Sequence, residues 1–143
     1  MGSQGIPQPR GWTSAGATSC NLPRAPIAPI LARRTLASGL ADLPRSCIED
    51  AQVLTSELVT NALRHGQGTI TMSILRDDRT LTVGVADQGS QDPQLRERDV
   101  TAVTGRGLQL LQALAAGWGT DPVQDGTGGK VIWFTLCTAS SRS

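Results

Sequence analysis

Hydrophobic residues recur every three or four positions in two stretches of the chain, which is the spacing of one face of an α-helix. The first stretch predicts a helix over about residues 27–40, ending near Gly39. The second predicts a longer helix over about residues 47–64, which stops before the breaker Gly66-Gln67-Gly68. Its expected buried stripe consists of Ile48, Ala51, Leu54, Leu58 and Ala62. The segment Ser46-Cys47-Ile48-Glu49 fits a capping box, so we expect its serine hydroxyl to cap the start of this helix.

After the breaker, hydrophobic residues alternate with polar or small ones, which predicts strands with one buried face. The expected inward positions are Ile70, Met72 and Ile74 in the first run and Leu81, Val83 and Val85 in the second. Asp77-Asp78-Arg79 lies between the two runs, so the simplest arrangement is a hairpin. Residues 118–121 carry a weaker strand pattern. The apolar run Val131 to Cys137 predicts a central strand, covered on one face and partly on the other.

A short helix is expected between these strands, because Gly105-Arg106-Gly107 is followed by closely spaced leucines. Its apolar positions are Leu108, Leu110, Leu111 and Leu114. The 15 residues from Ser90 to Thr104 are mostly polar and have no regular period, which predicts a mobile loop. Helices on one face of a mixed β-sheet give an α+β fold, a two-layer sandwich.

The length of 143 residues favours one compact domain. Prolines and glycines crowd the beginning of the chain, where hydrophobic residues are too sparse to offset the entropy cost of ordering. We therefore predict a flexible N-terminal arm over residues 1–20, a folded domain over residues 21–138 and a C-terminal tail over residues 139–143.

Charge and cysteine content exclude several classes of protein. The 13 Lys and Arg residues nearly balance the 12 Asp and Glu residues, and no dense basic run follows, so neither nucleic acid nor a membrane is an expected direct partner. The single histidine and three dispersed cysteines lack the close ligand pairs of a zinc site. No signal peptide or membrane span is visible, and reduced thiols suit a cytoplasmic location.

Three polar residues, Glu57, Asn61 and His65, are spaced at i, i+4 and i+8 and so form one column on the predicted long helix. A carboxylate and a carboxamide one turn apart can hold a hard cation or polarise a hydroxyl group. Polar columns on amphipathic helices are common, however, and the spacing alone favours an ordinary solvated face.

Other candidates lie at the ends of predicted elements. The amides of Gly105 and Gly107 at a helix start suit an anion, with Arg106 as a further contact, although a tight turn explains them equally well. Asp87 ends a strand and offers an acceptor where a planar ligand could approach, yet such a residue more often belongs to a turn. Lys130 could reach a phosphate or simply be solvated.

Order and spacing together change these odds. Glu57 to Gly66, Val85-Ala-Asp87-Gln-Gly89, Gly105-Arg-Gly107-Leu-Gln-Leu-Leu and Gly129-Lys-Val-Ile-Trp-Phe follow one another along the chain. This series closely resembles the N, G1, G2 and final-strand boxes of the GHKL ATPase superfamily, which has the histidine-kinase-like ATPase fold. The resemblance covers about residues 22–137, and the short form is similar to the bacterial anti-sigma-factor serine/threonine kinases.

The resemblance implies a role for each matching residue of an ATP-binding, kinase-like domain. Glu57 matches the catalytic general base, and Asn61 matches the Mg²⁺ ligand that bridges the nucleotide phosphates. Asp87 matches the acid that accepts from the adenine amino group, with Gly89 beside the base. The matches to the phosphate-contacting and remaining cofactor-binding positions are Gly105, Arg106, Gly107, Leu108 and Lys130. Residues 90–104 match the ATP lid.

The resulting hypothesis is a cytoplasmic regulator of transcription that binds ATP and Mg²⁺ and phosphorylates a serine or threonine. The implied partners are a small anti-sigma-factor antagonist and a sigma factor, and a homodimer remains open. The alternative is a catalytically weak or nucleotide-free sequestration module of the same fold. Gln91 and Val131, where the family has a second glycine and often a threonine, favour this alternative, whereas Glu57 and Asn61 favour the enzyme. A histidine-kinase catalytic domain fits less well, because no dimerisation helix or sensor precedes the boxes.

Overall fold

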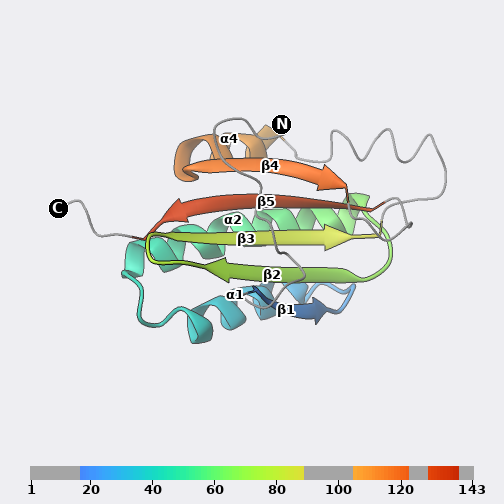
Figure 1. The fold of residues 1–143 in the computed structure, drawn as a ribbon. Coiled ribbons are helices and arrows are strands. Elements are labelled where there is room, and N and C mark those ends of the chain that lie inside the picture. Colours follow the sequence, from blue (N-terminus) through green and yellow to red (C-terminus); the bar gives the residue numbers. More distant parts are fainter. Residues whose placement is uncertain (1–16, 89–104, 123–128, 139–143) are drawn as a thin grey trace.

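The computed structural model describes residues 17–88, 105–122 and 129–138, which form a β-sheet with helices packed on one of its faces (Figure 1). In chain order the elements are β1 (Ala17–Leu22), α1 (Ala28–Gly39), α2 (Arg45–His65), β2 (Ile70–Arg76), β3 (Thr80–Asp87), α4 (Gly105–Leu114), β4 (Gly117–Pro122) and β5 (Lys130–Cys137). The predicted α+β, two-layer architecture is confirmed. None of the helices among these residues combines the length and apolar character needed to cross a bilayer.

The five strands are ordered β1-β2-β3-β5-β4, and every neighbouring pair is antiparallel. The mixed sheet expected from the sequence is therefore wrong for the described strands. The reason lies in the connections: β2 and β3, like β4 and β5, are joined by segments too short for the crossover that parallel neighbours require. Strand β5 is an interior strand that lies between β4 and β3, and β3 precedes both α4 and β4 in the chain.

The hydrophobic core lies between the sheet and the helices, and α2 crosses it over β3 and β5. The predicted stripe of α2 is confirmed, because Ala51, Leu54, Leu58 and Ala62 are buried and Ile48 packs at the margin of the core. The inward positions predicted for β2 and β3 also face this core. Burial of these apolar side chains, at about 25 cal/mol for each Å² removed from water, holds the two layers together.

The capping box predicted for α2 is wrong. The helix begins one residue earlier than Ser46, with Pro44 at the N-cap in an extended conformation, φ −57° and ψ 144°, and without a side-chain cap. The Pro44 carbonyl accepts from the amides of Cys47 and Ile48 at 3.0 and 3.1 Å, which starts the helical hydrogen-bond series. Ser46 therefore lies inside the first turn, where its hydroxyl comes too late to cap the helix.

Strand β1 was not predicted, and its first four residues were assigned to the flexible arm. Among the described strands it pairs only with β2, at the edge of the sheet, and its only buried residue is Leu22, so it carries no alternating hydrophobic pattern. Backbone pairing and polar contacts hold it instead, including Ser19 Oγ to Ser73 Oγ at 2.9 Å. The rest of the predicted arm, residues 1–16, the loop over residues 90–104 and the tail over residues 139–143 lie outside the described residues.

The β2–β3 hairpin is confirmed, and its turn is organised by one carboxylate. Asp77 Oδ1 accepts from the backbone amides of Arg79 and Thr80, and from the Thr80 hydroxyl, each at 2.9 Å. The hydrogen bond from the Arg79 amide and those from Thr80 hold the pKa of the Asp77 carboxyl below its usual range. This turn sets the register between β2 and β3, and it thereby fixes the position of Asp87, the last residue of β3, at the opposite end of the sheet.

Candidate functional site

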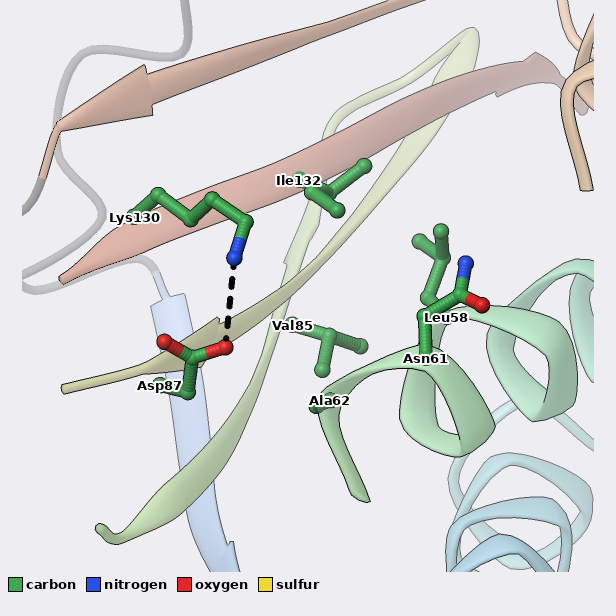
Figure 2. Close-up of a pocket in the computed structure, with 7 residues that line it drawn as sticks. All are labelled: Leu58, Asn61, Ala62, Val85, Asp87, Lys130 and Ile132. Carbon is green, nitrogen blue, oxygen red and sulfur yellow. Dashed lines mark hydrogen bonds and ion pairs between the residues drawn. The ribbon is translucent and has the colours of Figure 1, made fainter. Parts of the chain in front are cut away.

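A small hollow lies where the end of β3, the start of β5 and the last two turns of α2 meet (Figure 2). Its volume is about 220 Å³, counted with its opening to solvent. It is lined by Leu58, Asn61, Ala62, Val85, Asp87, Lys130 and Ile132. Four of these residues are apolar and three carry polar groups that converge on the hollow, which is the composition of a small-molecule site.

Strand register brings two of the polar groups together. Asp87 and Lys130 lie directly opposite each other in the antiparallel β3–β5 pair, so their side chains share one face of the sheet. Lys130 Nζ lies 3.5 Å from Asp87 Oδ2, the ion pair drawn in Figure 2. Only 4% of the Asp87 side chain and 17% of the Lys130 side chain are exposed, so this pair sits largely out of water.

Asn61 supplies the third polar group from α2. The residue is 3% exposed, and its Nδ2 has no hydrogen-bond partner among the described residues. Leaving a buried amide unsatisfied costs about 1–3 kcal/mol, so such a group calls for a ligand or water. Its carboxamide can offer an oxygen to a cation and an N–H to an anionic oxygen.

Two glycines fit closely against Asp87. A Cβ atom on Gly66 would collide with the Asp87 carboxylate, and one on Gly129 would collide with the Asp87 carbonyl oxygen. The loop that contains Gly66 is also tied to β3, because the amide of Gln88 donates to the carbonyl of Gln67 at 2.9 Å. Sequence analysis placed Gly66 in a breaker and both glycines at the ends of matched boxes, but it gave neither a role of its own, because their function depends on contacts between distant segments.

Arg24 joins the N-terminal part of the domain to the site. Its Nη1 donates to the carbonyls of Ala62 and Leu63 at 2.9 and 3.3 Å, and its Nε donates to that of Gly68 at 2.9 Å. The last carbonyls of a helix have no partner within the helix, and a cation is favoured there. Arg24 therefore fixes the end of α2 and the loop behind Asp87. No sequence pattern pointed to this residue.

Glu57 lies one helical turn before Asn61, outside the lining of the hollow. Its Oε2 is 3.3 Å from Nη2 of Arg106, in the first turn of α4. The Glu57 side chain is 21% exposed and that of Arg106 is 77% exposed. Because the Arg106 end of this pair is largely in water, the attraction is screened and contributes only about 0–1 kcal/mol, so the carboxylate is held by a contact that is easily exchanged.

A comparison with known protein families identifies the chain. The family described as "Histidine kinase-like ATPase domain" matches residues 23–136. The chain belongs to this ATPase family. The resemblance to GHKL ATPases inferred from the four boxes is thereby confirmed. Membership in an ATPase family implies nucleotide binding.

The proteins that resemble this ATPase domain include an anti-sigma factor and a protein of known structure. The anti-sigma F factor of Clostridium acetobutylicum is 29% identical over 115 residues, which cover 71% of this chain and 80% of that protein. The crystal structure of the RsbU and RsbW domains of Rv1364c from Mycobacterium tuberculosis superposes with a TM-score of 0.63 at 23% identity. That match covers 86% of this chain but 32% of the longer Mycobacterium chain, and it establishes the fold.

The remaining predicted residues do not lie together in the structure. Gly105, Gly107 and Leu108 lie at the start of α4, and this helix packs against α2. Gly107 is buried and Leu108 is half-buried. His65, the last residue of α2, is exposed and does not line the hollow, so the structure divides the predicted polar column of α2. Gly89 lies outside the described residues.

Proposed function

We propose that this ATPase domain binds ATP with Mg²⁺ in the hollow and phosphorylates a serine or threonine of a small antagonist protein, thereby regulating a sigma factor. The observation that carries the proposal is the buried Asn61 carboxamide, which has an unsatisfied nitrogen and faces the same hollow as Asp87. A member of an ATPase family with this pair of groups has the means to hold both ends of a nucleotide.

The base would bind between the apolar lining residues, with its exocyclic amino group donating to Asp87. A carboxylate offers only acceptors, so it favours a ring edge that carries an N–H group. The walls are formed by Leu58, Ala62, Val85 and Ile132. Val131 is not among the lining residues, because Lys130 and Ile132 face the hollow and strand residues alternate between faces. Val131, which stands where the family often has a threonine, therefore leaves these walls unchanged.

Asn61 is the residue that would hold Mg²⁺, through its carboxamide oxygen. No group of three His, Cys, Asp or Glu side chains that could hold a metal by themselves occurs in the described parts of the chain. This donor set fits Mg²⁺, which usually takes one or two protein ligands and completes its octahedron with phosphate oxygens and water. When bound, the ion would neutralise charge on the phosphates.

Glu57 would orient the accepting hydroxyl and take its proton. Its side chain lies on α2 one turn from Asn61, on the side that approaches α4. The accepting hydroxyl must replace or share the contact that Arg106 makes with the carboxylate. Because that contact is weak and Arg106 is mostly exposed, the exchange costs little. Arg106 is then placed to meet negative charge at the start of α4.

The antagonist and sigma-factor partners are proposed by similarity. One relative is itself named an anti-sigma F factor, and the structural neighbour contains an RsbW domain beside an RsbU domain. A cytoplasmic location accompanies this proposal.

The first test is nucleotide binding, measured as the shift of thermal unfolding of the full chain with ATP and Mg²⁺. At a free nucleotide concentration about 100 times Kd, binding to the native state adds about 2.7 kcal/mol of stability. Transfer is then followed as incorporation of labelled γ-phosphate into a purified antagonist protein. An unchanged melting temperature at millimolar ATP would refute the nucleotide site.

A sequestration module is the second candidate. The observation that favours it is the Glu57–Arg106 ion pair, because Arg106 contacts the carboxylate that is proposed to accept the proton. Such a module binds its partner at the same affinity with and without ATP and transfers no phosphate. Partner binding measured in both conditions, together with transfer, separates the two functions.

A further inference from the structure

The hollow is lined by a lysine, a residue type that is rare in this chain. Lys130 is the only lysine in the sequence, and the other 12 of the 13 basic residues are arginines. It lines the hollow from β5, next to the apolar side chain of Ile132 (Figure 2). An ammonium group is a compact charge with three donors and no acceptor, so it can donate to Asp87 and to a ligand at once.

The position of Lys130 brings a donor beside an acceptor at one end of the hollow. Its Nζ lies 3.5 Å from the Asp87 carboxylate, and both side chains are largely shielded from water. A ligand edge that fits this pair must itself carry a donor beside an acceptor. Adenine has such an edge, since its 6-amino group donates and N1 accepts. Hypoxanthine has the reverse arrangement, since O6 accepts and N1–H donates.

We propose that Lys130 is a specificity-determining residue, which together with Asp87 binds the donor–acceptor edge of a purine base and allows the site to accept 6-oxopurine as well as 6-aminopurine nucleotides. This inference rests on the proposed nucleotide-binding function and assigns Lys130 to the base rather than to the phosphates. A carboxylate alone would face O6 of a 6-oxopurine with like polarity, and that contact disfavours the base. The ammonium group offers O6 a charge-assisted donor instead.

The register of the sheet supports the assignment to the base. Lys130 is opposite Asp87 across the β3–β5 pair, whereas the residues matched to the phosphates, Asn61, Gly105 and Gly107, belong to α2 and α4. In Figure 2 the Lys130 side chain extends toward Asp87, and Asn61 lies across the hollow from this pair. The Lys130 end of the hollow is therefore suited to the base, whereas the phosphates would bind at the residues of α2 and α4.

The test compares the affinities of ADP and inosine diphosphate for the wild-type chain and for Lys130→Met, a variant of similar length without the charge. Loss of a hydrogen bond from a charged donor weakens binding by about tenfold or more. We expect Lys130→Met to weaken the binding of both diphosphates, because N1 of adenine and O6 of hypoxanthine each lose a donor. The loss should be at least tenfold larger for inosine diphosphate than for ADP, because only its O6 is then left to face the Asp87 carboxylate. Lys130→Gln, which keeps a neutral donor, should recover part of the lost affinity for inosine diphosphate.

Equal losses for the two diphosphates would overturn the proposal, and with adenosine binding unchanged they would assign Lys130 to a phosphate. A wild-type chain that binds neither diphosphate would refute the proposed function itself, which is a different result from an unchanged ratio of affinities. Thermal unfolding of each variant shows whether removal of the Asp87 partner has disturbed the fold.

A second measurement needs no substitution. Because the sequence has one lysine, the full chain labelled at the lysine ε-carbon gives a single side-chain NMR signal. Adenosine, which has no phosphate, should shift this signal at concentrations that occupy the site. A signal that moves with ADP but not with saturating adenosine would contradict a contact with the base.

Discussion

At the scale of single residues, Glu57 separates chemistry from binding. Glu57→Gln keeps the shape of the side chain and its hydrogen-bonding capacity but removes the charge needed to accept a proton. We expect phosphate transfer to fall by about 10² to 10⁴, with a much smaller change in nucleotide affinity. Parallel transfer and binding assays with a purified antagonist check this, and transfer at the wild-type rate would return Glu57 to a structural role.

Asn61→Ala should give the opposite pattern. Its carboxamide is the group expected to hold Mg²⁺, and it lines the hollow from a buried position. Nucleotide binding in the presence of Mg²⁺ should weaken, while binding in the presence of a chelator should change little. Titrations with and without the ion measure the difference, and an equal loss in both would contradict a role in holding the metal.

Gly129 is a residue whose missing side chain matters. Gly129→Ala would place a methyl group against the backbone of Asp87 and Gln88, so we expect a loss of about 1–3 kcal/mol in unfolding free energy. Gly39→Ala is a matched control, because a Cβ atom there has no neighbour within 4 Å. Chemical denaturation of both variants checks this, and equal stability would show that β3 and β5 can shift apart at no cost.

At the scale of secondary-structure elements, the end of α2 depends on Arg24. Removing its three hydrogen bonds with Arg24→Ala should lower the unfolding free energy by about 1–2 kcal/mol, since the last carbonyls of α2 lose their cation. Hydrogen exchange should become faster in the last turn of α2 and in residues 66–68. Arg34→Ala, at an exposed position of α1, is the control and should leave that exchange unchanged.

The β2–β3 turn has a pH dependence of known sign. Because amide donors lower the pKa of Asp77 in the folded chain, the ionised carboxylate stabilises the turn above the usual carboxyl range. That stabilisation is lost as the pH falls through the lowered pKa. Asp77→Ala should therefore be less stable than the wild type at pH 7, and the gap should close in acid. Thermal unfolding of both proteins from pH 7 to pH 2 measures the difference in stability. A difference that stays constant over this range would contradict this account.

The sequence predicted those elements whose burial follows a simple period. Helix α2 and the β2–β3 hairpin were found because their apolar residues face one core at spacings of 3.6 and 2. Strand β1 was missed because an edge strand is held by backbone pairing, which leaves no hydrophobic period. The capping box failed because Pro44, just ahead of it, already sets the start of α2.

At the scale of the whole molecule, the candidate site was only partly visible in the sequence. Asn61 and Asp87 were found through a family pattern, and the fold brings both to one hollow. Arg24 and the collisions at Gly66 and Gly129 depend on contacts between segments far apart in the chain, which a local pattern does not contain. The Glu57–Arg106 pair likewise exists only after α2 and α4 have packed together.

The order of strands in the sheet also determines when during folding the hollow comes into existence. The pairs α1–α2 and β2–β3 are neighbours in sequence, and local contacts of this kind close rapidly at a small entropic cost. Asp87 and Lys130 are 43 residues apart, and they meet only after β5 has inserted between β3 and β4. A chain in which synthesis or refolding has stopped short of this insertion has a formed hairpin and a formed helix pair but no place for a ligand. Nucleotide would therefore act on a stage of folding later than the local pairs, by capturing chains in which β3 and β5 have paired.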